Sequence, residues 1–329
     1  MKKAILWLFC LLAICQTEVR AQADVSQSLQ RHDFFYAGES KRIRMFIVKD
    51  GRVVWQYENK EWRGEISDAL LMTDGHILLA HQYGIAEVTQ GNQVVWHYDA
   101  PEGTEIHTIQ PVGNDCVVFL QNGKPAKCVV MQVPSMTVLR EFVLPTSEKG
   151  SVHGQFRNAR LTQRGTLLVA NMGMGFVAEY NSEGKEVDRW TMPRVWSVQE
   201  LDNGNLLATC SKGLIREFTR TGHTVWELSA DSCGAVQTQK CVRLKNGNHI
   251  VNNWYNEWNK TPLDSLNPPV QAMEIDRGGK VVWKLCSWKN PDLGPSTTIQ
   301  PLDQAVNRER LFFGEFNGRK PKLFMRPNQ

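Results

Sequence analysis

Three histidines and one arginine are the residues of this sequence best suited by type and position to carry chemistry. His81 and His107 stand at the ends of apolar segments, and His153 shares the stretch SVHGQFRNAR with Arg157. An imidazole can accept or donate a proton near neutral pH, and a guanidinium can bind an anionic group. We therefore expect His107, His153, Arg157 and His81 to carry acid–base and charge-stabilising roles.

A divalent metal is the alternative role for the same histidines. His81, His107 and His153, with a carboxylate such as Glu39, could hold an ion and leave one position open for a substrate. The sequence has no His-x-His pair that would support ligation. Histidines that form hydrogen bonds without a metal are therefore the favoured interpretation, and no cofactor is assigned.

The elements that must position these residues repeat along the chain. Each unit has two apolar strands joined by a turn with glycine, a third strand with a shared glutamate, and a tail. The tails are GRVVWQY (51–57), GNQVVWHY (91–98), GHTVWEL (222–228) and GKVVWKL (279–285). A unit of four short strands that recurs about every 40–50 residues is typical of a β-propeller blade.

The number of blades depends on how the strands are counted. Second strands recur seven times, from FYAGE (35–39) to LFFGE (311–315), whereas first and fourth strands recur six times. We predict an all-β fold with a single propeller of seven four-stranded blades over residues 24–329, and six blades as the alternative. The ring is expected to close where strands near Leu311 and Leu323 pair beside the N-terminal blade.

Aligning the repeats predicts which side chains meet at the mouth of the central channel, because first strands start and second strands end on the same face. The residues that end second strands are Glu39, His81, Gln121, Asn171, Cys210, Asn253 and Glu315. The residues that precede first strands are Ser67, His107, Arg157, Trp196, Gln239 and Thr297. Ordinary exposed turns favour Lys, Asp, Ser and Gly, so this set instead indicates a site for a polar ligand.

Aromatic residues add a second indication of a ligand on this face. The insertion at 252–270 carries Trp254, Tyr255 and Trp258, and Tyr83 follows His81. Aromatic planes beside amides and charges suit a sugar, whose C–H faces stack on rings while its hydroxyls form hydrogen bonds. A lid packed on its own aromatic residues is the equal alternative.

The repeated tail resembles that of the quinoprotein-like propellers, the group that holds pyrroloquinoline quinone (PQQ) dehydrogenases, outer-membrane assembly lipoproteins and arylsulfotransferases. The resemblance covers nearly the whole chain after the leader and implies a propeller with the tail tryptophan docked between blades. The PQQ enzymes have eight blades and adjacent cysteines beneath the quinone, and this sequence has no adjacent cysteine pair. PQQ is therefore not expected. The arylsulfotransferases work through histidines and an arginine at the propeller mouth, which His107, His153 and Arg157 would match.

The N-terminus indicates export from the cytoplasm. Residues 1–23 have the form of a secretory signal peptide, with Lys2 and Lys3 before an apolar stretch at 4–15 and small residues after it. We expect a periplasmic or secreted protein; lipidation at Cys15 is less favoured, because the preceding Ile14 is bulky. The net charge is only +4, which excludes nucleic acid as an expected partner. We expect a monomer without a transmembrane segment that binds a small-molecule or glycan ligand.

Two functions remain open on the sequence alone. The first is an enzyme acting on a glycan-like or anionic substrate by lyase, hydrolase or sulfuryl-transfer chemistry, and the 252–270 insertion, which suggests a covered pocket, tilts the interpretation towards it. The second is a non-catalytic propeller that binds carbohydrate or protein. The fold cannot decide between them, since this architecture serves both classes.

Overall fold

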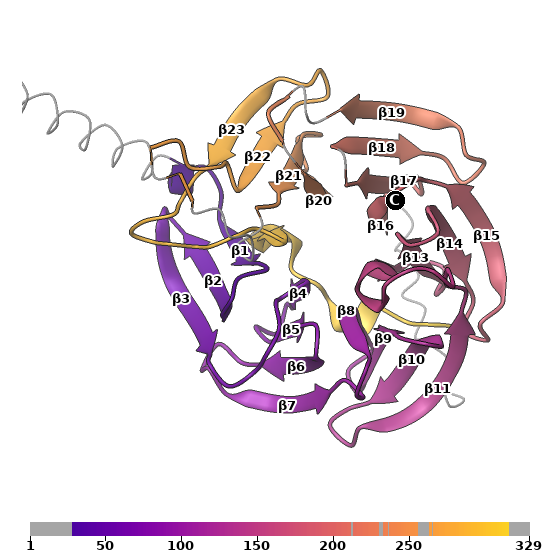
Figure 1. Ribbon diagram of the computed structural model, residues 1–329. Helices are drawn as coiled ribbons and strands as arrows, with labels where there is room; N and C mark the ends of the chain where they lie inside the picture. The colour runs from indigo at the N-terminus through magenta and orange to yellow at the C-terminus, as the bar shows by residue number, and fades with distance from the viewer. Residues whose placement is uncertain are drawn as a thin grey trace, which may run out of the picture.

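The computed structural model describes residues 28–211, 213–229, 233–235, 237–255, 263–264 and 266–315. In these ranges, strands β1 to β24 form six four-stranded antiparallel sheets that are arranged as the blades of a ring (Figure 1). Short apolar segments separated by glycine turns form these strands, as their alternation predicts.

The four strand positions of a blade differ in their distance from the central channel. The first strands, which line the channel, are β24 (Thr298–Pro301), β4 (Asp68–Leu71), β8 (Glu105–Val112), β12 (Phe156–Leu161), β16 (Val195–Glu200) and β20 (Thr238–Arg243). The second strands are β1 (Phe34–Ala37), β5 (Ile77–Ala80), β9 (Cys116–Asn122), β13 (Leu167–Asn171), β17 (Leu206–Cys210) and β21 (His249–Asn253). The third strands are β2 (Ile43–Lys49), β6 (Gly84–Val88), β10 (Ala126–Gln132), β14 (Phe176–Tyr180), β18 (Leu214–Phe218) and β22 (Ala272–Ile275). The fourth, outermost strands are β3 (Arg52–Asn59), β7 (Val94–Asp99), β11 (Thr137–Leu144), β15 (Glu186–Thr191), β19 (Thr224–Ser229) and β23 (Val281–Leu285).

The tail tryptophans hold neighbouring blades together. The indole N–H of Trp55 donates to the carbonyl oxygen of Gln90 in the next blade at 2.9 Å. Trp226 makes the same contact with the carbonyl of Arg277 at 2.9 Å. The repeated Gly-x-V-V-W tail is therefore a packing motif: the indoles of Trp55 and Trp226 satisfy their N–H on the adjacent blade, whereas that of Trp96 donates to Glu87 of its own blade.

The glutamate shared by the third strands also joins blades. Buried Glu217 accepts hydrogen bonds from Arg243 and Arg277 of the following blade. Buried Glu179 likewise pairs with Arg220 of the next blade. A buried carboxylate needs such partners, so these glutamates serve the ring rather than the mouth.

The prediction of seven blades is wrong, and the ring has six. The segment LFFGE (311–315), which was counted as a seventh second strand, is not a strand. Its backbone instead lies against turns of two blades, where Gly113 donates to Leu311 and Gly314 donates to Gly165. Phe313 is fully buried there, so the segment is apolar because it packs under the ring.

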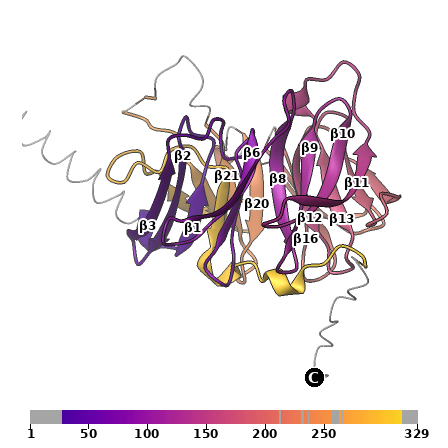
Figure 2. The same cartoon turned by 90° about the horizontal axis from the view of Figure 1, so that it is seen from below.

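Closure of the ring occurs earlier in the chain than Leu311. Strand β24 supplies the first strand of the N-terminal blade and pairs antiparallel with β1, with Gln300 opposite Phe35. The chain then continues through two short 3₁₀ turns, η3 (Leu302–Gln304) and η4 (Arg308–Arg310), along one face of the ring (yellow in Figure 2). Leu323 lies outside the described residues. Within the described ranges, no helix is both long and apolar enough to cross a membrane.

Candidate functional site

A cavity of about 590 Å³ lies at the mouth of the channel, on the face opposite η3 and η4. Its lining residues are Glu39, Arg63, Gly64, Glu65, Gln82, Tyr83, His153, Arg157, Trp196 and Trp254. The volume lies within the range of small-molecule sites. Six of these residues were predicted from the sequence: Glu39, Tyr83, His153, Arg157, Trp196 and Trp254.

Irregularities in the first strands aim side chains at this region. The pairing of β8 with β9 shifts between Ile106 and Ile109, so His107 lies in a bulge. The pairing of β12 shifts in the same way around Arg157, and that of β16 around Trp196. A β-bulge redirects a side chain and is common beside active sites. The repeated bulge explains why the aligned positions turn toward the channel.

Glu105 joins two histidines below the cavity. Its Oε2 lies 2.7 Å from Nε2 of His107 and 2.8 Å from Nδ1 of His153. Burial alone would raise the pKa of Glu105, but the hydrogen bonds from the two histidines outweigh burial and hold this pKa far below its usual range. Glu105 is therefore a carboxylate that accepts from both rings.

Arg157 determines which nitrogen of His107 carries the proton. Nη1 of Arg157 lies 3.1 Å from Nδ1 of His107, and Ser67 Oγ lies 2.8 Å from the same nitrogen. A guanidinium can only donate, so Nδ1 accepts and Nε2–H donates to Glu105. Burial lowers the pKa of His107 to about 3, and the Arg157 cation adds to the shift. His107 is therefore a neutral positioning group.

His153 is the histidine that can exchange protons with a ligand. It lies in the 3₁₀ turn η1 (Val152–Gly154), where the hydroxyl of Ser151 accepts from the backbone N–H of Gly154. Its side chain is 44% exposed, and Nε2 lies 3.9 Å from Glu65. Because Nδ1 donates to Glu105, Nε2 is left on the cavity side with a lone pair or a proton to offer.

Arg157 has hydrogen-bonding capacity to spare. The residue is buried, its Nε has no hydrogen-bond partner, and its ion pairs with Glu39 and Glu65 are long, at 3.9 Å each. Its guanidinium also lies over the ring of Trp196, 4.9 Å from the centroid. Because Arg157 lines the mouth cavity, its guanidinium is placed to meet an anionic group of a ligand there.

A metal site of the predicted kind does not form. In the described part of the chain, the ligand atoms that come together are those of Glu105, His107 and His153, within 4.8 Å of one another, without His81. A metal on Nε2 of His107 would require that nitrogen to lose the proton that Arg157 imposes on it. The group therefore fits a hydrogen-bonded triad better than a ligand set.

His81 occupies a separate position from the other two histidines. Its Nε2 lies 3.0 Å from Nε2 of His97, and its Nδ1 lies 3.0 Å from the carbonyl of Arg63. Trp62 stacks on both rings, with centroid distances of 5.1 Å to His81 and 4.5 Å to His97. Burial lowers the pKa of His81 to about 4. The expected meeting of His81, His107 and His153 as one set is therefore not observed.

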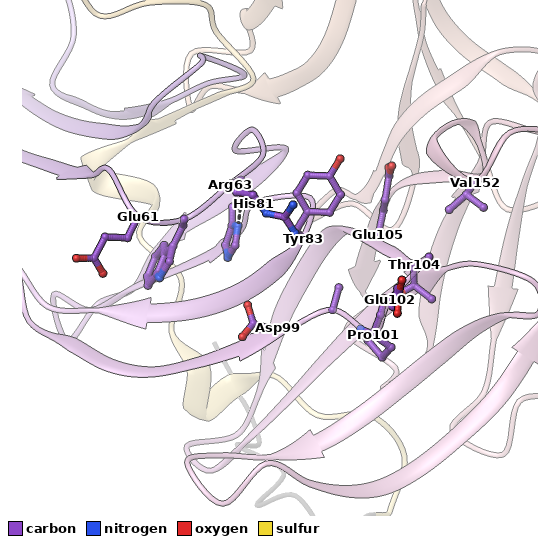
Figure 3. Close-up of a pocket in the computed structure, with 13 residues that line it drawn as sticks. Glu61, Arg63, His81, Tyr83, Asp99, Pro101, Glu102, Thr104, Glu105 and Val152 are labelled. Atoms are coloured by element: carbon purple, nitrogen blue, oxygen red, sulfur yellow. Dashed lines mark hydrogen bonds between the residues drawn. The ribbon is translucent and has the colours of Figure 1, made fainter.

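His81 lines a second cavity of about 580 Å³ beside the mouth. Tyr83 and Arg63, which also line the mouth cavity, stand between the two, with the guanidinium 5.2 Å from the ring centroid. Figure 3 shows Glu61, Arg63 and His81 on one side of this cavity, and Pro101, Glu102, Thr104 and Glu105 on the other. The two cavities share Arg63 and Tyr83 as lining residues, so they adjoin each other at these two side chains and offer an extended cleft.

Several predicted site residues lie away from the mouth cavity. Asn171 bonds to the carbonyl of Pro145, and Asn253 bonds to that of Val270, so both hold loops. Gln121 lies in β9 and lines neither cavity. Glu315 follows Gly314 on the opposite face. Asn171, Asn253 and Gln121 belong to second strands, and Glu315 to a segment that is not a strand. Second strands do not line the channel, because the first strand of each blade lies between them and it.

Three further predicted residues are Gln239 of β20 and the tryptophans Trp254 and Trp258 of the 252–270 insertion. Gln239 lies in the bulge of β20 and is fully buried. Neither end of its carboxamide has a hydrogen-bond partner, yet it does not line the mouth cavity. Trp258 lies outside the described residues. Trp254 donates its indole N–H to Glu39, which ties the start of the insertion to the mouth.

Glu65, Glu105 and Arg63 were not predicted as site residues from the sequence. Glu65 and Glu105 stand two positions before the aligned residues Ser67 and His107. Side chains two apart in extended chain point to the same side. Extending the alignment by two residues would therefore have found both carboxylates.

No protein-family model and no curated protein sequence matches the chain. Among solved structures, a protein of unknown function from Bacteroides caccae has a TM-score of 0.69 and 23% identity, over 82% of this chain and 98% of that one. A streptogramin B lyase has a TM-score of 0.54 and 15% identity, over 79% and 86% of the two chains. A catalytically inactive histidine-to-alanine variant of virginiamycin B lyase from Staphylococcus aureus, with quinupristin, has a TM-score of 0.53 and 12% identity, over 77% and 84%.

These likenesses establish the fold. The chain is a single six-bladed β-propeller, and its structural neighbours include propeller proteins that are lyases. The resemblance to the quinoprotein group stays a resemblance, because no family model supports it.

Proposed function

We propose that this protein is a lyase-type enzyme that acts on a glycan-like ligand with an anionic group, bound at the propeller mouth. The observation that carries the proposal is the pairing of half-exposed His153 with the ionised carboxylate of Glu105. A carboxylate that accepts from Nδ1 orients the ring and leaves Nε2 toward the cavity for proton transfer.

Elimination assigns a role to each group that faces the cavity. Arg157 would bind the anionic group of the ligand through its unused donors, as a planar guanidinium binds carboxylates. His153 Nε2 would take a proton from the carbon next to that group. The electron pair left behind forms a carbon–carbon double bond and expels the oxygen on the neighbouring carbon, to which the imidazolium returns the proton. Arg157 stabilises the negative charge that develops in the transition state.

The aromatic side chains suit a sugar-like ligand. Trp196 and Trp254 line the mouth cavity, and Tyr83 is partly exposed at its border with the second cavity. Ring faces stack on the C–H faces of sugars, while Gln82, Glu65 and Glu39 offer acceptors and donors for hydroxyls. The second cavity gives room for a further unit of a longer ligand.

The structural neighbours support lyase chemistry only as an analogy, because their identities to this chain are low. Hydrolysis and sulfuryl transfer would use the same His153 and Arg157. The product distinguishes them, since only elimination creates a carbon–carbon double bond.

The test is a screen of acidic oligosaccharides by ultraviolet absorbance of the unsaturated product. His153→Ala should lower kcat/KM about 10²–10⁴-fold, because it removes the proton-transfer group. Its free energy of unfolding should change by less than about 0.5 kcal/mol, since the side chain is half exposed. His223→Ala, an exposed histidine in a turn of the fifth blade, is the matched control and should keep full activity.

Two outcomes would contradict the proposal. Turnover that survives His153→Ala would remove His153 from the chemistry. Ligand binding without reaction, unaffected by His153→Ala, would leave the non-catalytic binding propeller.

We further propose that the protein is exported, on the basis of the signal-like residues 1–23. Mass spectrometry of the protein from its native host should find an N-terminus after Ala21 or Ala23. An intact Met1 would contradict export by this route.

A further inference from the structure

Gln82, in the turn between β5 and β6, lines the mouth cavity in a backbone conformation that glutamine seldom adopts. Its φ angle is +69°, in the left-handed region, where the Cβ of most residues meets the backbone. Strain of this kind persists only where the surrounding structure enforces it, and it is concentrated at functional sites. Gln82 is therefore a candidate for a role in the site beyond packing.

Three contacts enforce this conformation. The carbonyl oxygen of Gln82 accepts from the backbone N–H of Ile106 in the next blade at 2.7 Å, and the backbone N–H of Tyr83 donates to the carbonyl of His81 at 2.8 Å. Gly64 lies directly on the turn, because a Cβ there would be 3.0 Å from the Cβ of Gln82 and 2.3 Å from the His81 carbonyl oxygen. The start of the Gln82 side chain is thus fixed relative to two blades before any ligand binds.

The polarity of the Gln82 carboxamide is fixed as well. Its Nε2 lies 3.2 Å from Oε1 of Glu105. Glu105 is ionised and can only accept, so the N–H end of the carboxamide must face it and the amide cannot turn over. Within the described residues, no group donates to Oε1 of Gln82, and this oxygen is not buried. It is therefore an accessible acceptor in a residue that lines the mouth cavity.

Gln82 and His153 are held by the two oxygens of one carboxylate. Gln82 donates to Oε1 of Glu105, and His153 donates to Oε2 at 2.8 Å. A single sugar ring that places a C–H against His153 can therefore also reach the carboxamide oxygen of Gln82. The other acceptors of the cavity, Glu39 and Glu65, are carboxylates that each face Arg157 at 3.9 Å. Gln82 differs from them in offering a neutral acceptor, which suits a hydroxyl.

We propose that Gln82 is a specificity-determining residue, whose Oε1 accepts a hydrogen bond from a free hydroxyl on the sugar unit that lies against His153. The inference rests on the proposed function, because it takes an acidic sugar unit bound at Arg157 as the ligand. A unit in which that hydroxyl is missing, or carries a methyl or sulfate group, has no donor for the fixed acceptor and leaves it without a partner. The site therefore selects uronic-acid units that are unsubstituted at this position.

The test uses methyl galacturonide, a single uronic-acid unit, and its 2-fluoro and 3-fluoro analogues, in which fluorine replaces one hydroxyl. The carbon next to the acidic C–H carries only a hydroxyl, which is a poor leaving group, so binding is measured without turnover. Isothermal titration calorimetry of the full chain gives each dissociation constant. One of the two analogues should bind the wild-type protein about 3–10-fold more weakly than the parent sugar, because fluorine cannot donate.

Gln82→Met removes the acceptor and keeps a side chain of similar length. It should weaken binding of methyl galacturonide by about the same 3–10-fold, and it should abolish the difference between the parent sugar and that analogue. A role confined to holding Glu105 would weaken all three ligands and leave the difference between them intact. Gln93→Met, at an exposed turn of the same blade, is the matched control and should bind all three ligands as the wild type does.

Equal affinity of the wild-type protein for the parent sugar and both analogues would overturn the inference, and this measurement needs no variant. So would a wild-type protein that does not bind methyl galacturonide, or a Gln82→Met protein that still discriminates against the analogue. Failure of the proposed function is a separate result. A screen without unsaturated product, together with discrimination that Gln82→Met abolishes, removes the elimination chemistry and keeps the selected hydroxyl.

Discussion

The two ends of the channel each hold an ionic cluster around a carboxylate. The clusters differ in how completely their other members are buried and hydrogen-bonded. At the end covered by the C-terminal segment, Asp68 lies between Arg160 and Lys240. Both of its oxygens accept charged donors, and all members are buried or nearly so. At the mouth, Glu105 is just as well bonded, but His153 keeps a half-exposed ring and Arg157 keeps a buried nitrogen without a partner.

The difference distinguishes a structural cluster from a reactive one. The carboxylate is saturated in both, so its own bonding does not reveal the role. The informative groups are the partners of the carboxylate. His153 is half exposed and lines a cavity of small-molecule size, whereas Lys240 donates all its N–H groups to the protein itself.

The largest expected effect comes from Asp68→Ala. It leaves Arg160 and Lys240 buried without their shared partner and should lower the free energy of unfolding by about 3–5 kcal/mol. Glu105→Ala at the open mouth should cost less, about 1–2 kcal/mol. Urea denaturation of both variants measures the contrast. Equal losses would break the comparison between the two ends.

The next-largest effect concerns pH: the two clusters should lose their contributions to the free energy of unfolding in different pH ranges. Burial lowers the pKa of His107 from 6.5 to about 3, so the unfolded chain binds a proton that the folded chain refuses. The stability that this neutral ring contributes is complete above pH 6.5 and is lost progressively as the pH falls below it. Asp68, whose pKa is held below its usual 3.8, loses its contribution only below that value.

His107→Gln tests this assignment, because a carboxamide can still donate to Glu105 and accept from Arg157. The slope of unfolding free energy against pH should fall by up to about 1.4 kcal/mol per pH unit below pH 6.5. His81 and His249, which are also shifted downward, keep their share of the slope. An unchanged slope would mean that His107 is protonated in the folded protein.

The smallest effect is expected from Tyr83→Ala at the border of the two mouth cavities. The ring is 37% exposed, so the free energy of unfolding should change by less than about 0.5 kcal/mol. Binding of an oligosaccharide long enough to reach both cavities should weaken by about 2–5-fold, whereas a monosaccharide should bind unchanged. Isothermal titration calorimetry of the two ligands makes the measurement, and an equal loss for both would contradict an extended cleft.

The fold could be predicted from the sequence because its strongest signal is local. A tail tryptophan such as Trp226 must dock on the next blade, so its recurrence marks the blade period. The number of blades could not be read in the same way. Phe313 is as apolar as a strand residue because it packs under the ring, and pattern alone does not separate these two kinds of burial.

Only part of the candidate site could be predicted from the sequence, because a repeat pattern locates positions along a strand but not the partners of a side chain. Alignment locates the end of a strand, and this was enough for Arg157 and Trp196, which lie at bulges of channel-lining strands. His81 ends a second strand, and its side chain turns toward His97 of the same blade. Which neighbour a side chain meets depends on rotamers and on partners far along the chain, and neither is visible in a strand-end pattern.

The pairing of β24 with β1 also has a consequence for how the chain folds. Five blades are built from consecutive strands and need only local loops to form, whereas the remaining blade joins Phe35 to Gln300 across nearly the whole sequence. The conformational entropy lost in closing so long a loop must be offset by that single pairing. A nascent chain can therefore assemble its middle blades in order while the ring stays open, and it becomes circular only after residue 301 is available.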